Sequence, residues 1–240
     1  MCIRKAALIG FLMMGFVFAG KATALDVNIA KLLPYVDIQY GGKKVRIMRI
    51  QDKDHRIEGG FTKTSRPCPP FCFQPMSVSP GVTTVGEVEV VKFIARKYKT
   101  KQGLIVDART QEWFESGTIP GSVNIPFTVF NVDMDVLELE GDDSAIVRAM
   151  RLFGVKKNIT EQGNFFSRLF SGETDNSNKK LDFSKAKDLL VFCNGPWCEQ
   201  SPRAIHGLLE MGYPPEKLFY YRGGMQLWQM GGFTTVSPEL

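Results

Sequence analysis

The sequence predicts an α/β protein in which a parallel sheet is covered by helices on both faces and preceded by a small β-hairpin extension. Two patterns predict this fold class. After Pro80-Gly81, strand-like and helical runs alternate, and near the start Gly41-Gly42 separates two runs of strand character. The composition agrees, since 44% hydrophobic and 23% charged residues in a chain of 240 are typical of globular proteins.

Each element of the sheet region is predicted from its own pattern. Residues 85–98 mix apolar and charged residues as an amphipathic helix does, whereas residues 104–106 and 189–192 are short, wholly apolar runs typical of buried strands. The other expected elements are a helical turn at Trp113-Phe114, a strand over 122–125, a helix over 202–211, a strand over 218–221 and a short helix over 225–230. In such sheets, ligands bind beyond the carboxyl ends of the strands.

The region before the sheet has a different character. Residues 36–40 and 43–50 flank the two glycines and predict the hairpin. Residues 66–75 contain four prolines and cannot form regular helix or central strand, so they are expected to be a stiff connector. We therefore divide the mature chain into an N-terminal β extension with a Cys/Pro-rich connector over 25–80 and a sheet domain over 81–240.

The first 24 residues are interpreted as a signal peptide. Arg4 and Lys5 form a positive start, an apolar run follows, and Ala22-Thr23-Ala24 has the small-residue pattern of a cleavage site. The expected location is periplasmic or secreted, with no stable membrane insertion after cleavage, because the apolar run is shorter than the roughly 20 residues that span a bilayer. Removal leaves 27 basic and 25 acidic residues, a balance that does not indicate a nucleic-acid partner.

An insertion is expected at about residues 127–187. It contains a helical run over 144–153, a polar stretch over 172–180, and a group of acids without calcium-loop spacing, which we interpret as a solvated surface. These acids are Asp133, Asp135, Glu138, Glu140, Asp142 and Asp143.

The cysteines of the mature chain form two close pairs, Cys68 with Cys72 and Cys193 with Cys198. Neither pair has the two-residue spacing of a zinc knuckle, and the whole chain has only two histidines, so disulfide or thiol chemistry is favoured over a metal site and no cofactor is expected. Pro69 and Pro70 stiffen the short turn between the first two cysteines, and we therefore expect Cys68 and Cys72 to be bonded to each other.

The second pair lies in the most informative stretch of the sequence. A buried strand delivers Cys193 to its carboxyl end, and Ser201 is expected to cap the following helix with Pro202 at its first position. Backbone amides of the loop and the positive end of that helix would favour a thiolate on Cys193 without a histidine. Between these ends, the expected active-site loop consists of Asn194, Gly195, Pro196, Trp197, Cys198, Glu199 and Gln200.

Four motifs in order give the chain a resemblance to the rhodanese-like sulfurtransferase family. They are Asp107-Ala108-Arg109 after a strand, a Gly117 to Pro126 segment of the form Gly-x-Ile-Pro-Gly-x-x-Asn-Ile-Pro, Cys193 at a strand end, and Arg222-Gly223-Gly224 followed by Trp228. The resemblance covers about 85–235 and leaves Cys68 and Cys72 outside it.

The resemblance implies that Cys193 takes a sulfane sulfur from a small donor, holds it as a persulfide and passes it to a thiol or another nucleophilic acceptor. A periplasmic protein partner is also conceivable. Asp107 and Arg109 are interpreted as a structural ion pair, and Trp228 as a core residue. Arg203 is a candidate supporting cation from the first turn of the helix after the loop.

The loop departs from the family pattern in two ways. Ser201 stands eight residues after Cys193 rather than six, and the only charge between them is Glu199. This loop disfavours thiosulfate as the donor, and Glu199 stands where phosphatase relatives need an arginine, so a carboxylate there would repel phosphate. Cys198 keeps two alternatives open: a thiol-redox protein using Cys193 with Cys198, and a non-catalytic interaction module.

Overall fold

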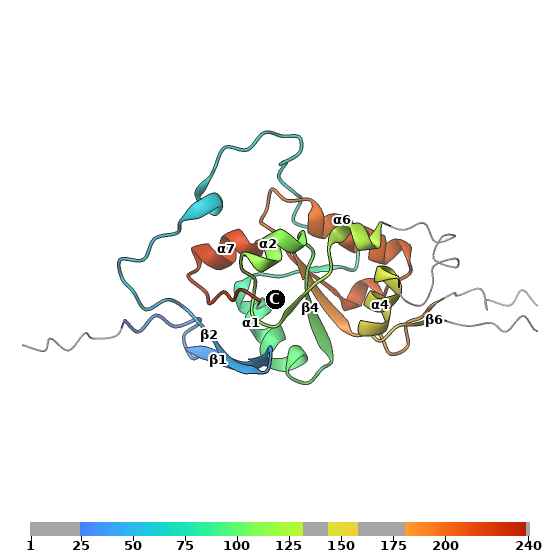
Figure 1. The fold of residues 1–240 in the computed structure, drawn as a ribbon, viewed down its shortest axis with the longest axis horizontal. Helices are drawn as coiled ribbons and strands as arrows, with labels where there is room; N and C mark the ends of the chain where they lie inside the picture. The colour runs from blue at the N-terminus through green and yellow to red at the C-terminus, as the bar shows by residue number, and fades with distance from the viewer. Residues whose placement is uncertain (1–24, 132–143, 158–180, 239–240) are drawn as a thin grey trace, which may run out of the picture.

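The computed structural model describes residues 25–131, 144–157 and 181–238, and contains the predicted parallel sheet (Figure 1). The expected signal peptide, the acids between 133 and 143 and the polar stretch over 172–180 lie outside the described residues. The five strands run in the order β3-β9-β8-β4-β5, and every pairing between them is parallel. Their bounds are Thr83–Thr84, Leu218–Tyr221, Asp188–Phe192, Gly103–Asp107 and Ser122–Asn124, in that order.

Alternate side chains of the central strand feed two separate cores. Leu189 and Val191 join one cluster with helices α4 (Ala145–Leu152) and α6 (Gln200–Glu210), whereas Leu190 and Phe192 join the other with α1 (Glu87–Phe93) and α7 (Gly224–Met230). Successive side chains of a strand point to opposite faces, so a strand buried on both faces is apolar throughout. The predicted fold class is confirmed.

The predicted hairpin is present as β1 (Tyr35–Tyr40) and β2 (Lys43–Met48), paired antiparallel. Gly41 and Gly42 have φ values of 56° and 74°, the left-handed conformation that a two-residue hairpin turn requires. Its apolar side chains join the same core cluster as α1, and Tyr40 Oη donates a hydrogen bond to the Ser122 carbonyl at 3.0 Å. The extension is therefore packed onto the sheet domain rather than tethered beside it.

The remaining elements are short. They are the 3₁₀ turns η1 (Gly59–Thr62), η3 (Phe127–Phe130) and η4 (Pro215–Lys217), the π-helical turn η2 (Ile94–Tyr98), helix α2 (Gln111–Glu115), and strands β6 (Lys156–Lys157) and β7 (Leu181–Asp182), which pair antiparallel. None of the helices in the part of the chain that the structure describes has the length and apolar character needed to span a bilayer.

The start of α6 differs from the prediction. The helix begins at Gln200 with Glu199 as its N-cap, two residues earlier than a Ser201 cap would place it. Ser201 lies inside the helix, and its hydroxyl donates to the sulfur of Cys193 instead of capping the backbone. The prediction of a Ser201 cap was wrong because this hydroxyl has a partner in the preceding loop that local sequence rules do not include.

We call residues 59–76 the clasp. It contains η1 and the Cys/Pro-rich connector, and in Figure 1 it is the cyan-to-teal loop that arches above α7 toward the beginning of α6. Cys68 and Cys72 are joined by a disulfide, with a Cα–Cα distance of 4.6 Å. Gln74 N–H donates to the Pro196 carbonyl at 2.7 Å, so the clasp reaches the loop that follows β8.

Candidate active site

The two cysteines of the candidate site lie where β8 ends and α6 begins. Cys193 directly follows β8, and its carbonyl accepts a hydrogen bond from Met225 N–H at 3.0 Å. Gly224 has a φ of 53°, and a Cβ there would lie 2.4 Å from the Cys193 carbonyl oxygen. This position needs glycine because the first residue of α7 closes directly onto the backbone of the loop.

Cys193 is almost completely inaccessible, with 1% of its surface exposed. Its Sγ accepts a hydrogen bond from Ser201 Oγ at 3.0 Å, and its own thiol points to the Cys198 carbonyl at 3.4 Å. Burial raises the pKa of the Cys193 thiol well above its usual value, and the hydrogen bond with Cys198 raises it further. Hydrogen bonds from Ser201 act in the opposite direction but are weaker.

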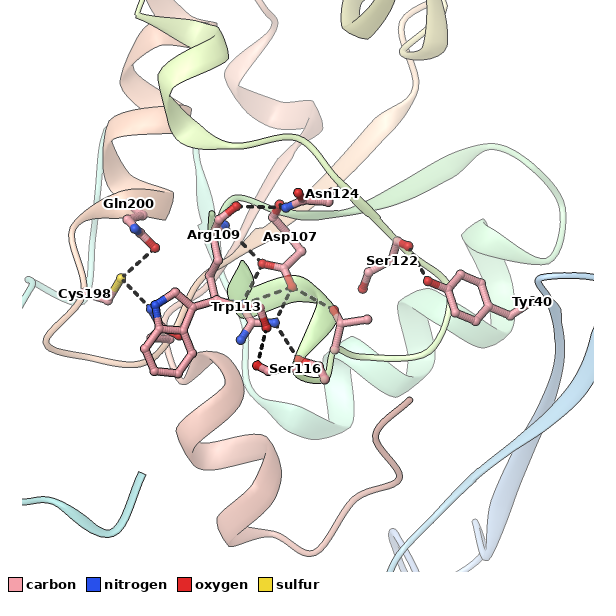
Figure 2. A network of polar contacts seen from close by, with 12 residues as sticks. Tyr40, Asp107, Arg109, Trp113, Ser116, Ser122, Asn124, Cys198 and Gln200 are labelled. Carbon is pink, nitrogen blue, oxygen red and sulfur yellow. Dashed lines mark hydrogen bonds and ion pairs between the residues drawn. The ribbon is translucent and has the colours of Figure 1, made fainter. Parts of the chain in front are cut away.

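Cys198 has the opposite electrostatic environment. The neighbouring Cys193 thiol and the backbone amides of Asn194 and Gln200 favour a negative charge on its sulfur, and together they outweigh burial and lower the pKa of Cys198 to about 7. Asn194 Nδ2 lies 3.8 Å from the Cys198 Sγ. Gln200 Oε1 lies 3.6 Å from the same sulfur, and Figure 2 shows this contact. The pair therefore carries its first negative charge on Cys198, which differs from the expectation of a thiolate on Cys193.

The rest of the loop is a tight and largely buried turn. Cys198 N–H donates to the Gly195 carbonyl at 2.9 Å, and Trp197 Nε1 donates to Gln226 Oε1 at 2.7 Å. Glu199 is exposed and accepts a hydrogen bond from Arg203 at 3.4 Å. The guanidinium of Arg203 also lies over the Phe127 ring, 4.6 Å from its centroid, so the structure holds this candidate cation outside the thiol pair.

Asp107 and Arg109 form the expected ion pair, and both side chains are fully buried. Arg109 Nη2 lies 2.6 Å from Asp107 Oδ2 and also donates to the Gly117 carbonyl at 2.7 Å, while Thr118 Oγ1 donates to the same carboxylate oxygen at 2.7 Å (Figure 2). Asn124 Nδ2 donates to both the Asp107 and Arg109 carbonyls. The first two motifs thus fasten the loops after β4 and before β5 to each other.

Sequence reasoning missed the clasp as part of the site. Phe61 packs against the small buried cluster formed by Cys193, Trp197 and Cys198. The Arg66 guanidinium lies 3.8 Å from the centroid of the Trp197 ring. Phe71 meets the same indole edge-on, with centroids 5.7 Å apart. The residues that cover the thiols come from more than 120 positions earlier in the chain, and only an aromatic residue and an arginine near the prolines hinted at them.

Comparison with known proteins identifies the family. The rhodanese-like domain family matches residues 91–230, more than half of the chain, and the chain belongs to this family. The match begins within α1, so the hairpin and the clasp lie outside it. Trp228 is fully buried, as a core residue of this family motif was expected to be. No curated protein sequence matches the chain significantly.

Solved structures with the same fold are distant. A human single-domain sulfurtransferase is 20% identical, covering 62% of this chain and 96% of its own, with a TM-score of 0.36. A thiosulfate sulfurtransferase from Pseudomonas aeruginosa is 15% identical, covering 66% and 21%, with a TM-score of 0.36. A possible tyrosine phosphatase of unknown function from Rhodopseudomonas palustris is 17% identical, covering 66% and 88%, with a TM-score of 0.40.

Proposed function

We propose that this protein is an exported sulfurtransferase that carries sulfane sulfur as a persulfide on Cys193. The observation that carries the proposal is the arrangement at the strand end: Cys193 Sγ accepts a hydrogen bond from the Ser201 hydroxyl, and its thiol contacts the carbonyl of Cys198, whose own thiol is the more acidic of the two. Family membership supports a sulfurtransferase-type activity for this fold. The donor and acceptor classes are those that the family resemblance implies, a small sulfane-sulfur donor and a thiol or another nucleophile.

Cys198 supplies the base that a histidine-free site needs. The Cys193 thiol lies beside the Cys198 sulfur, which carries the first charge, and donates its hydrogen to the Cys198 carbonyl at 3.4 Å. Rotation of the S–H toward the charged sulfur and transfer of the proton leave a thiolate on Cys193 and a neutral thiol on Cys198. The Ser201 hydroxyl then donates to the negative sulfur of Cys193. Cys198 thus acts as a positioned proton acceptor.

The transfer itself is balanced without an added oxidant. The Cys193 thiolate forms a bond to the outer sulfur of the donor, the bond between that sulfur and the rest of the donor breaks, and the leaving group takes the electron pair as an anion. An acceptor thiolate then attacks the outer sulfur of the persulfide, which returns Cys193 as a thiolate and releases the acceptor as a persulfide. Both halves move one sulfur atom and no net electrons.

The disulfide between Cys68 and Cys72 supports export. Cys68 is exposed, and an exposed disulfide persists in an oxidising compartment such as the periplasm. We infer cleavage after Ala24, so that the mature protein begins at Leu25. N-terminal sequencing of periplasmic or secreted material tests this inference, and a retained Met1 on such material contradicts it.

The direct test of the proposed function is intact-mass analysis after incubation with sulfane-sulfur donors. We expect the wild-type protein to gain the mass of one sulfur atom, mapped to Cys193, and to lose it on addition of a small thiol. Thiosulfate, which is a dianion, is compared with a small organic persulfide of lower negative charge, because a loop whose one charge is Glu199 favours the less highly charged donor. Absence of an adduct from every donor, with both thiols shown to be free, favours the interaction-module alternative.

One observation favours a second candidate, a thiol-redox protein. Cys193 and Cys198 are both free, and the Cys193 thiol contacts the Cys198 carbonyl at 3.4 Å. An attacking and a resolving thiol are neighbours in this way. Mild oxidation distinguishes the candidates. With an oxidant alone, a redox pair loses two hydrogens and closes a Cys193–Cys198 disulfide that a dithiol reopens. A persulfide carrier keeps both thiols under the same oxidant, and it gains one sulfur atom on Cys193 only when a sulfane-sulfur donor is added.

A further inference from the structure

The thiol pair has a covering wall that does not belong to the family domain. Cys193 is 1% exposed and Cys198 is 5% exposed, so a donor or acceptor cannot reach either sulfur while the site has this arrangement. Phe61 of the clasp packs against the cluster that contains both cysteines and Trp197. The cover therefore consists of the indole of the loop and, above it, side chains from a segment outside residues 91–230.

The clasp holds the loop by two kinds of contact. Arg66 and Phe71 meet the Trp197 ring, one over its face at 3.8 Å and the other edge-on at 5.7 Å. Backbone groups then fix the position of the clasp: Gln226 Nε2 donates to the Phe61 carbonyl at 3.0 Å, and Arg222 Nε donates to the Gln74 carbonyl at 2.9 Å. The side-chain contacts close the site, and the hydrogen bonds set where the cover lies.

Two features of the clasp favour its opening. Arg66 Nε is buried and makes no hydrogen bond within the described part of the chain, and Phe71 remains 38% exposed although it touches Trp197. A buried donor without an acceptor costs free energy that contact with water restores. The clasp is therefore held by a few surface contacts and hydrogen bonds, while the unsatisfied Arg66 donor favours opening. Partial opening costs little free energy compared with unfolding the sheet domain.

We propose that the clasp is the outer wall of the thiol site, and that Arg66 and Phe71 determine how large a molecule can reach Cys193 and Cys198. Small openings admit molecules of the size of cyanide, sulfide or a low-molecular-weight thiol, whereas a thiol on a folded protein needs the clasp to be displaced. Where it concerns sulfur acceptors, this inference rests on the proposed function. It makes Arg66 and Phe71 specificity-determining residues for that reaction.

The test compares two alkylating reagents on the native full-length mature protein. Iodoacetamide and a maleimide carried on a long polyethylene glycol are each reacted with the two free thiols, and the modified fraction is followed by intact mass. Rates are normalised to those in denaturant. We expect Phe71→Ala and Arg66→Ala each to raise the rate with the bulky maleimide by about 3- to 10-fold, and the rate with iodoacetamide by less.

Phe73→Ala is the matched control. Phe73 lies two residues from Phe71 in the same clasp, is 76% exposed, and should leave both rates unchanged on truncation. Equal bulky-reagent rates in wild type, Phe71→Ala and Arg66→Ala overturn the inference, as does an equal increase in Phe73→Ala. Alkylation requires no sulfur transfer, so a protein that shows the expected rates but forms no persulfide refutes the proposed function and leaves the wall in place.

The acceptor assay extends the test to the reaction. A preformed persulfide is discharged with cyanide and with a reduced protein thiol, and the ratio of the two rates is measured. We expect Phe71→Ala to shift this ratio toward the protein thiol by about 3- to 10-fold, with Phe73→Ala at the wild-type ratio. An unchanged ratio in Phe71→Ala contradicts the specificity role.

Discussion

The chain contains two close cysteine pairs that the structure treats in opposite ways. Cys68 and Cys72 are bonded on an exposed turn, whereas Cys193 and Cys198 remain free in a buried loop. Their spacings differ by one residue. Spacing alone therefore does not decide the chemistry of a cysteine pair, and the surrounding groups do.

The buried pair is surrounded by donors that stabilise a sulfur anion. Ser201 donates to Cys193, and Asn194 and Gln200 present amides to Cys198. Such donors lower the pKa of a thiol and favour nucleophilic chemistry. The pair in the clasp instead lies in a proline-stiffened turn. Phe71, between these two cysteines, contacts the Trp197 ring of the site, so the disulfide helps to fix the shape of the clasp and takes no part in the thiol chemistry.

The largest expected effect is that of removing the nucleophile. Cys193→Ser should abolish persulfide formation, a loss of at least about 1,000-fold, because no other sulfur occupies the strand end. Cys198→Ser should still form the adduct on Cys193, more slowly at neutral pH, since it removes a base and leaves the nucleophile. The measurement is sulfur transferred to cyanide or to a small thiol. Equal loss in both variants would favour the redox pair.

The next effect concerns pH and separates the roles of the two buried thiols. The wild-type rate should rise with pH through about 7, where Cys198 loses its proton, and level off above it, because below that pH neither sulfur is charged. In Cys198→Ser the rise should move above the usual thiol range, since burial raises the pKa of Cys193.

At pH 7 this change should slow persulfide formation by about 10- to 100-fold, and the difference should shrink as pH rises. Rates of mass gain measured across the pH range test it, with Cys68 and Cys72 kept oxidised in every sample. The same pH profile in both proteins would mean that Cys198 takes no proton from Cys193.

Most of the sheet domain could be predicted from the sequence, because its signals are local. A wholly apolar run such as residues 189–192 predicts a buried strand, and a glycine pair between two strand-like runs predicts a hairpin turn, without information from the rest of the chain. The place of Cys193 was equally readable, as a cysteine between a buried strand and a helix. The division of charge between Cys193 and Cys198 was not, because it depends on which amides face which sulfur once the loop has closed.

The covering wall was also beyond sequence reasoning. Arg66 and Phe71 meet Trp197 across more than 120 residues of chain, and no periodicity relates them. Likewise, the N-cap of α6 is Glu199 and not Ser201, because the Ser201 side chain contacts Cys193. Capping preferences do not predict this contact. Tertiary contacts that combine two segments leave little trace in either segment alone.

A third change tests how closely the buried pair depends on its neighbours. In Gly224→Ala, the new Cβ would meet the Cys193 carbonyl oxygen at 2.4 Å and the Gly195 nitrogen at 2.7 Å, at a φ that disfavours a side chain. We expect a loss of about 1–3 kcal/mol in the free energy of unfolding and a changed pH profile. Denaturant unfolding measures the first. Gly60→Ala, where a Cβ has nothing within 4 Å, is the control, and equal stability in both variants would contradict the close approach.

The smallest expected effect on the fold is that of the exposed pair. Replacing both Cys68 and Cys72 by serine removes a closed loop of five residues, and chain entropy puts the greatest loss at about 2 kcal/mol. Since the clasp is a surface segment outside the two hydrophobic cores, part of that loss should appear as local opening and not as global unfolding.

We therefore expect the Tm of the double variant to fall by less than about 4 °C, while the bulky maleimide reaches the buried thiols faster than in the wild type. Calorimetry and the alkylation rates measure the two effects in one sample. A fall in Tm of more than about 10 °C would mean that the clasp unfolds together with the core. A wild-type Tm together with a wild-type alkylation rate would mean that the Cys68–Cys72 disulfide does not fix the position of the clasp. The expected separation of the two effects would assign the exposed pair to controlling access and the buried pair to chemistry.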